Sequence, residues 1–315
     1  MKSTTRMVSL VEDYLAVRRQ MGFALKSARG QLLGFARFAD ETGHRGPVTF
    51  GLAVQWVQSG SLHTPLTWAR RLELLRPFLK YRSQFDEGTA IVPRNYFGPA
   101  HRRLVPHIYR EQEIVALMKA TDNLQPTYGL RPRTYRTLFG LLAATGLRIS
   151  EAIHLQVQDV DWAHGILTVR QTKFCKSRLV PLHPTTVAEL RRYVEAQERQ
   201  LGRRKDGAFF VSDGGKALPN RTVHNTFERL RTQLGWIARG GHASPRIHDF
   251  RHTFICRSLL ESYRRNQSPD HIMDALSTYV GHVKVSDTYW YLTATPELMA
   301  VAAKKFAKFI EGGVR

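Results

Sequence analysis

Apolar residues recur every three or four positions through much of the first ninety residues, which is the spacing of amphipathic helices. The runs with this spacing are Leu10 to Met21, Leu32 to Phe38, Val54 to Val57 and Thr67 to Tyr81. Gly43 to Pro47 interrupts the pattern between the second and third runs. We therefore predict that residues 1–93 form a small helical bundle.

A basic segment with several helix breakers follows this bundle. Residues 94–106 include Arg94, Arg102 and Arg103 together with Pro99 and Pro106. Such a composition is typical of a linker. The pattern thus divides the chain into a helical domain (1–93), a basic linker (94–106) and a larger domain (107–315).

The larger domain combines predicted helices with one pair of short strands. Helical spacing recurs at Glu111–Ala120, Thr134–Ala144, Ile149–Leu155, Thr185–Leu201, Asn220–Leu234, His248–Tyr263, Asp270–Val280 and Pro296–Ile310. Ile166–Arg170 and Ser177–Pro181 are β-like runs that flank a basic turn, so we predict a hairpin there. The expected fold class is mainly α (α+β), with a small β-sheet in the second domain.

Composition favours a polyanionic partner. The 315 residues include 47 Lys+Arg and 26 Asp+Glu, which gives a net charge of +21. Residues 1–95 hold 14 basic and 7 acidic side chains, so the excess is not confined to one tail. A field of this sign attracts DNA or RNA, and both predicted domains could contact one duplex. A basic surface that serves only solubility is the alternative at this stage.

Cysteine content and hydropathy indicate the compartment. Cys175 and Cys256 are the two cysteines, which is too few for a disulfide framework. The first twenty residues lack the apolar core of a signal peptide, and the longest apolar run, Leu138 to Leu147, is about half the length of a membrane span. We expect a cytoplasmic protein without a membrane partner.

Two arginines are candidate phosphate ligands. Arg148 and Glu151 share a helix face just after Gly146, where the chain can turn sharply. His248 and Arg251 repeat this spacing near a predicted helix N-terminus, which favours an anion. An arginine fork can hold two phosphate oxygens, and a histidine can move a proton. From spacing alone, a surface ion pair between Arg148 and Glu151 is the favoured interpretation.

Further candidates lie elsewhere in the second domain. Lys173 occupies the predicted hairpin tip, from which a lysine could protonate a leaving oxygen. His282 follows Gly281 at the end of a predicted helix, and Tyr291 lies nine positions later beside Tyr289. Taken singly, Lys173 is better explained as part of a solvated turn and Tyr291 as part of an aromatic core segment.

A zinc site is a competing interpretation of the histidines. His248, His252 and Cys256 are spaced at i, i+4 and i+8 on one predicted helix. No fourth ligand follows at a typical spacing, and the glutamate of a His-Glu-x-x-His motif is absent. We therefore expect no metal.

Taken together, these motifs resemble those of the phage-integrase family of tyrosine recombinases. The matching pieces are Ala144–Glu151 (ATGLRISE), Lys173 with Arg178–Leu182 (RLVPL), His248–Thr253 (HDFRHT), Gly281–His282 and Tyr291. They follow the family's order and spacing over residues 107–295, and the first ninety residues resemble its core-binding domain in size. Val280 stands where the family commonly has leucine, and Tyr289 is a second phenol near the expected nucleophile.

The resemblance implies a set of catalytic roles. The residues that match the family's catalytic positions are Arg148, Lys173, His248, Arg251, His282 and Tyr291. Tyr291 would attack the scissile phosphate to give a 3′-phosphotyrosine, with its oxygens held by Arg148 and Arg251. Lys173 would protonate the departing 5′ oxygen, His248 would act as acid or base, and His282 would donate a hydrogen bond. Neither a metal nor another cofactor is implied.

The resemblance also implies partners and rival activities. A recombinase of this family would bind double-stranded DNA as a homo-oligomer, with a dimer on each site and a tetramer in the synapse, where strands pass through a Holliday junction. An accessory recombinase is a further partner, and the helix Pro296–Ile310 would dock on a neighbouring protomer. Because no arm-binding module precedes the bundle, an Xer-like or transposon-type enzyme of DNA integration is favoured. A type IB topoisomerase-like activity and a non-catalytic DNA-binding protein are the rivals.

Overall fold

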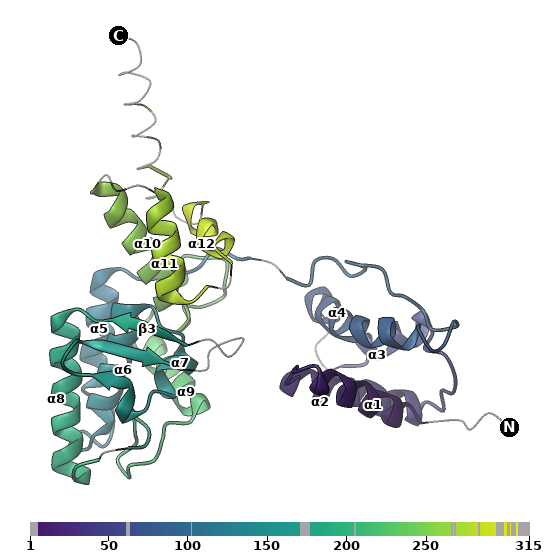
Figure 1. Cartoon of the computed structure of the whole chain (residues 1–315), viewed down its shortest axis with the longest axis horizontal. Helices are drawn as coiled ribbons and strands as arrows, with labels where there is room; N and C mark the ends of the chain where they lie inside the picture. The colour runs from purple at the N-terminus through teal and green to yellow at the C-terminus, as the bar shows by residue number, and fades with distance from the viewer. Residues whose placement is uncertain are drawn as a thin grey trace. The chain divides into compact units, whose positions relative to one another are not determined.

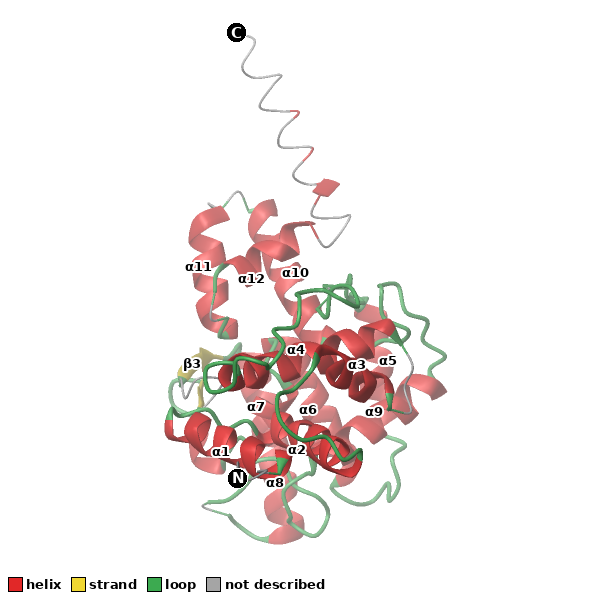
Figure 2. Ribbon diagram, turned by 90° about the vertical axis from the view of Figure 1, so that its right-hand side faces the viewer, coloured by secondary structure: helices red, strands yellow, loops and turns green. Residues whose placement is uncertain are grey.

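The chain folds into two compact units, Met1–Arg103 and Leu104–Arg315. The computed structural model in Figure 1 describes residues 6–60, 64–101, 103–170, 177–204, 206–265, 267, 269–282, 284–293, 299–300, 303 and 307. Within these residues helices predominate, and the strands form one small sheet (Figure 2). The mainly α (α+β) class expected from the hydrophobic pattern is therefore confirmed.

The first unit is a helical bundle with an aromatic core. Its helices are α1 (Met7–Gln20), α2 (Lys26–Glu41), α3 (Phe50–Gln58) and α4 (Pro65–Arg82). Phe78 of α4 is fully buried, and its ring meets those of Tyr14 and Phe35 at centroid distances of 5.5 and 6.2 Å. Each helix covers a run predicted from the apolar spacing, because that spacing places these rings on the faces that pack together.

The segment predicted as a linker contacts the first unit near its start and the second unit near its end. Ala100 is buried in the first unit, where its carbonyl accepts a hydrogen bond from Arg70 Nε at 3.3 Å. In the second unit, the Val105 carbonyl accepts a hydrogen bond from the Gly241 N–H at 2.8 Å. These two hydrogen bonds extend each unit into the basic segment 94–106.

The second unit carries the remaining described helices. They are α5 (Glu111–Thr121), α6 (Arg131–Thr145), α7 (Ile149–Ile153), α8 (Pro184–Leu201), α9 (Asn220–Gln233), α10 (Asp249–Arg264), α11 (Pro269–Val280) and α12 (Ser286–Tyr289), with short 3₁₀ turns η1 (Val157–Asp159) and η3 (Trp290–Thr293). The predicted helices from 111 to 280 are confirmed to within a few residues. The helical character of α12 and η3 was not predicted, because runs of four residues are too short to show a period.

The sheet contains the predicted hairpin and one further strand. Strands β2 (Ile166–Val169) and β3 (Arg178–Pro181) pair antiparallel, with Leu167 opposite Val180 and both side chains buried. The two-residue strand β1 (Val160–Asp161) pairs with the other edge of β2 and was not foreseen. The hairpin tip, residues 171–176, lies outside the described residues.

A stack of aromatic rings fixes the start of α10. Phe250 is fully buried, and its ring stacks on Tyr109 at a centroid distance of 4.5 Å and on Phe139 of α6 at 6.4 Å. Phe227 of α9 meets the same ring edge-on at 6.1 Å. Because successive helical residues point about 100° apart, this anchor determines the direction in which Arg251 points.

The apolar run Leu138 to Leu147 forms the core-facing part of α6 and the turn after it. Leu138, Phe139, Leu142 and Leu147 are all buried in the second unit. Among the described residues, every helix is too short or too polar to cross a lipid bilayer.

A glycine makes the turn between α6 and α7 possible. Gly146 ends α6 with φ +62°, and its N–H donates to the Leu142 carbonyl at 2.9 Å. A Cβ atom at this position would lie 2.6 Å from Cδ1 of Phe254 in α10. Both the left-handed backbone and the close approach of α10 therefore require glycine.

We expect Gly146→Ala to lower the free energy of unfolding by roughly 2 to 4 kcal/mol, because it combines left-handed strain with overpacking. Urea unfolding of the purified protein measures this change. Gly140→Ala is the matched control, since Gly140 lies within α6 and its added Cβ would meet only Met118 Sδ at 3.9 Å. It should stabilise the protein by about 0.5 to 1 kcal/mol. Equal effects at the two glycines would contradict the strain argument.

Candidate active site

Residues far apart in the sequence converge where α6 and α11 end and α10 begins. Arg251 of α10 donates from Nη1 to the Gly146 carbonyl at 2.9 Å and from Nη2 to the Val280 carbonyl at 2.6 Å. Arg148 donates from Nη2 to the Gly281 carbonyl at 3.1 Å. The structure thus brings both predicted arginines to the loop that carries His282.

Arg251 is a buried cation. Its side chain is 2% exposed, and burial together with the nearby Arg148 charge lowers its pKa to about 9. At neutral pH the guanidinium therefore keeps its charge. Because it has five N–H donors and its two carbonyl bonds use two of them, donors remain for an anion.

Glu151 joins two of the arginines. Its Oε1 accepts from Arg148 Nη1 at 2.8 Å, and its Oε2 accepts from Arg178 Nη2 at 2.8 Å. Burial alone would raise the pKa of this carboxyl, but the bonds to Arg178 and Arg148 lower it to about 2. Arg178 also donates from Nε to the Tyr279 carbonyl at 2.8 Å, which links β3 to α11. Glu151 is therefore an anion at neutral pH and orients Arg148.

The absence of a side chain at Gly281 allows Arg178 to approach the end of α11. Gly281 has φ +72°, and a Cβ there would lie 2.8 Å from Arg178 Nη1. The turn continues as the His282 N–H donates to the Ser277 carbonyl at 2.9 Å. The predicted position of His282 at a helix exit is confirmed by this geometry.

Both predicted histidines are neutral at physiological pH. Burial, followed by the charge of Arg251, lowers the pKa of His248 to about 4 and that of His282 to about 4. His282 Nδ1 lies 2.7 Å from Oγ1 of the fully buried Thr288, which fixes its ring. When Nδ1 accepts from the threonine hydroxyl, Nε2 carries the proton and is the ring donor that remains.

The two candidate phenols occupy different environments. Tyr291 is 3% exposed, and its ring lies parallel to that of His282 at a centroid distance of 6.2 Å. It is also close enough to Arg251 that an ionised phenol would raise the pKa of that guanidinium. Tyr289 is 42% exposed. Of the two, Tyr291 is the phenol packed among the residues of this site.

His252 is the residue of this site that sequence reasoning did not assign to the reaction. Its Nδ1 lies 2.6 Å from the Tyr291 hydroxyl oxygen. The available signal was its position directly after Arg251 and one helical turn after His248, which we interpreted only as a zinc face. Within the described part of the chain, His248, His252 and Cys256 do not form a group that could hold a metal ion.

Two predicted features lie outside the described residues. Lys173 falls in residues 171–176, and most of the predicted helix Pro296–Ile310 is likewise not described. The roles assigned to them stay predictions.

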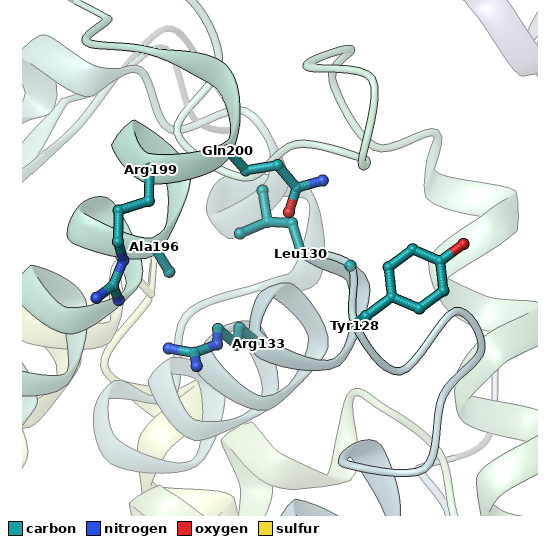
Figure 3. Close-up of a pocket in the computed structure, with 7 residues that line it drawn as sticks. Tyr128, Leu130, Arg133, Ala196, Arg199 and Gln200 are labelled. Carbon is teal, nitrogen blue, oxygen red and sulfur yellow. The ribbon is translucent and has the colours of Figure 1, made fainter.

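A pocket of the second unit lies at the opposite end of α6 from these residues. It has a volume of about 540 Å³, and Arg133 of α6 and Arg199 of α8 line it, with Tyr128 on another side (Figure 3). Arg133 belongs to the first turn of α6, whereas Arg251 contacts Gly146 after its last turn. At 1.5 Å per residue, these positions are roughly 20 Å apart.

Comparison with known sequences identifies a family and close relatives. Residues 107–297 match the family described as "Phage integrase family". The y4rB protein of Sinorhizobium fredii, named as a candidate integrase/recombinase, is 38% identical over 95% of this chain and 96% of its own length. Tyrosine recombinase XerC of Pelotomaculum thermopropionicum is 28% identical over 76% of this chain and 74% of its own.

Solved structures share the fold at low sequence identity. The Tn1549 transposon integrase in complex with circular intermediate DNA superposes with a TM-score of 0.67 at 16% identity, over 96% of this chain and 100% of its own. The XerH site-specific recombinase bound to a palindromic difH substrate gives a TM-score of 0.64 at 17% identity, over 88% and 78%. At such identity the likeness establishes the arrangement of the elements.

We expect Glu151→Gln to destabilise the protein by about 3 kcal/mol at pH 7, since the carboxylate that two arginines bind is lost. The pKa of Glu151 is depressed in the folded state, from an ordinary value of 4.5 to about 2. The stability it contributes is therefore present above about pH 4.5 and is lost as pH falls toward 2. Urea unfolding between pH 7 and pH 3 should show the gap between wild type and variant narrowing.

Glu189→Gln is the control for this measurement. Glu189 pairs with Arg192 on the surface, and both side chains are more than half exposed. Its removal should change stability by less than about 1 kcal/mol. A gap between wild type and Glu151→Gln that stays constant down to pH 3 would contradict the buried ion-pair account.

Proposed function

The chain belongs to the phage integrase family and is a tyrosine-type site-specific recombinase, and we propose that it cuts and rejoins DNA through a 3′-phosphotyrosine formed at Tyr291. One arrangement of side chains supports this proposal. A buried phenol lies beside two histidines and within the electrostatic reach of a buried guanidinium, all in one protomer.

Double-stranded DNA is the proposed substrate. The net charge of +21 favours a polyanion, and the excess extends over both units. The related Tn1549 integrase and XerH structures are, by their titles, complexes with DNA. Substrate recognition in this chain would combine phosphate contacts, which position the duplex, with base contacts that define its site.

In the proposed cleavage step, Arg148 and Arg251 bind the non-bridging oxygens of the scissile phosphate. The Tyr291 oxygen attacks phosphorus and loses its proton to a base of the site, the bond to the 5′ oxygen breaks, and Lys173 gives that oxygen a proton. His282 donates a hydrogen bond to the phosphorane, and His248 serves as an acid or base nearby. Rejoining is the same sequence in reverse, with a 5′-hydroxyl as the nucleophile.

Preorganised positive charge supports this chemistry. Arg148 and Arg251 are already held by carbonyl and carboxylate groups, so they need little reorganisation as negative charge grows on the phosphorane. One phosphoester bond replaces another, so the step needs no nucleotide as an energy source. We propose no metal or other cofactor.

Complete recombination would require assembly. We propose that a dimer binds each DNA site, that two dimers form a tetramer, and that strands pass through a Holliday junction. The segment Pro296–Ile310 would join neighbouring protomers, with residues 1–93 acting as the core-binding domain. A topoisomerase-like enzyme uses the same cleavage chemistry without synapsis, so formation of junctions between two labelled duplexes distinguishes the two activities.

We expect Tyr291→Phe to abolish the covalent protein–DNA adduct on a nicked suicide duplex, because phenylalanine lacks the attacking oxygen. Electrophoresis under denaturing conditions detects the adduct, and a mobility-shift assay checks that DNA binding persists. Tyr289→Phe is the matched control and should form adduct within about threefold of wild type, since its phenol is exposed. Adduct formation by Tyr291→Phe would overturn the choice of nucleophile.

We further expect each protomer to cleave with its own tyrosine, because Tyr291 packs on His252 and His282 of the same chain. A mixture of Arg148→Ala and Tyr291→Phe should therefore stay at least about 100-fold below wild type in adduct formation. A mixture of wild type with Tyr291→Phe controls for inhibition by mixed assembly. Recovery of adduct in the first mixture would show that the tyrosine acts on a neighbouring site.

A further inference from the structure

We propose that His252 is a further catalytic residue, which accepts the hydroxyl proton of Tyr291 as that oxygen attacks the scissile phosphate. The proposal rests on the proposed function, because it takes Tyr291 as the nucleophile. It departs from the family resemblance, which assigns proton transfer near the tyrosine to His248.

The contact between the two side chains is direct. His252 Nδ1 lies 2.6 Å from the Tyr291 hydroxyl oxygen, which is within the range expected for a general base and its proton. The two rings are tilted by 43° at a centroid distance of 5.4 Å. Trp290 packs edge-on against both rings, at 6.1 Å from His252 and 5.1 Å from Tyr291. Packing of Trp290 against both rings therefore helps to hold the hydroxyl on this nitrogen.

His248 occupies a different position relative to the phenol. It precedes α10 as the N-cap, one turn before His252, and its ring meets the His252 ring edge-on at 4.8 Å. Its position near Arg148 and Arg251 suits a contact with the phosphate, whereas His252 lies against the attacking oxygen. The spacing of four residues, about one helical turn, thus places His248 toward the phosphate and His252 beside the nucleophile.

The proton balance of the step is complete. With the neutral His252 in its Nε2–H form, Nδ1 has a lone pair that accepts the hydrogen bond from the phenol. As the new O–P bond forms, the O–H bond breaks and its proton moves to Nδ1. The bond from phosphorus to the 5′ oxygen breaks, and that oxygen receives its proton from Lys173. On rejoining, the imidazolium returns its proton to the tyrosine oxygen.

Electrostatics makes this transfer depend on bound phosphate. Burial, and then nearby positive charge, lowers the pKa of His252 to about 2. The titratable and charged groups that face it are His242, Arg246, His248, Arg251 and Tyr291. A phosphate held by Arg251 brings a negative charge that opposes this field and raises the pKa of His252. The phenol therefore stays protonated until DNA occupies the site.

The test is the pH dependence of single-turnover adduct formation on a suicide duplex, at saturating protein, for wild type and His252→Asn. The asparagine side chain places an amide oxygen near the position of Nδ1, so it preserves a hydrogen bond to the phenol but takes no proton. We expect the variant to be about 100-fold to 10,000-fold slower at pH 7. Its rate should then rise about tenfold per pH unit from 7 to 9, because only the ionised phenol can attack.

Wild type should change by less than about threefold over the same range, because its base is already neutral there. Trp290→Phe is the matched packing control, and it should retain the pH-independent profile. His252→Ala provides a second measurement, in which added imidazole should restore part of the lost rate at pH 7. Mobility shifts on the same duplex report whether each variant still folds and binds DNA.

Specific results would overturn the proposal. If His252→Asn forms adduct as fast as wild type, His252 is not a base in this step. If its rate is lower than wild type by the same factor at every pH, His252 has only a packing or positioning role. Absence of imidazole rescue in a DNA-binding His252→Ala variant would do the same. Adduct formed by Tyr291→Phe would instead mean that the nucleophile itself is misassigned, which separates failure of the proposed function from failure of the role of His252.

Discussion

The second unit is organised around a buried guanidinium that joins the ends of two helices. Arg251 donates to the carbonyls of Gly146, after α6, and of Val280, at the end of α11. A buried cation is costly unless hydrogen bonds satisfy it, and helix C-termini offer carbonyls with partial negative charge. Both helix ends and the start of α10 are therefore fixed relative to one another, and with them the residues that flank each end.

This constraint explains why the site can remain strongly cationic. Glu151 is shared by Arg148 and Arg178, and Arg251 is held by carbonyl groups within the described residues. Three guanidiniums thus share one carboxylate and several backbone dipoles. The site therefore keeps a net positive charge, which a bound phosphodiester would neutralise. The same charge, together with burial, keeps the neighbouring histidines neutral.

Short-range pattern was sufficient for most of the fold. Apolar spacing predicted the helices from α1 to α11 because their buried faces repeat with the helical period. β-branched residues on either side of a basic turn predicted the β2–β3 hairpin. Strand β1 and the turns around Trp290 escaped prediction, because elements of two to four residues acquire their structure from the contacts that surround them.

For the site, the sequence by itself determined which residue types are present and, through their order and spacing, the family to which the chain belongs. It also placed Arg148 after a glycine turn and His282 at a helix exit, since both positions follow from local backbone rules. Spacing along the chain already favoured Tyr291 over Tyr289, but only the tertiary structure showed that Tyr291 is buried and Tyr289 exposed, and only it placed His252 beside the Tyr291 hydroxyl. The physical reason is that a contact between residues 39 positions apart depends on how α10, α11 and η3 pack, and no local period records that packing.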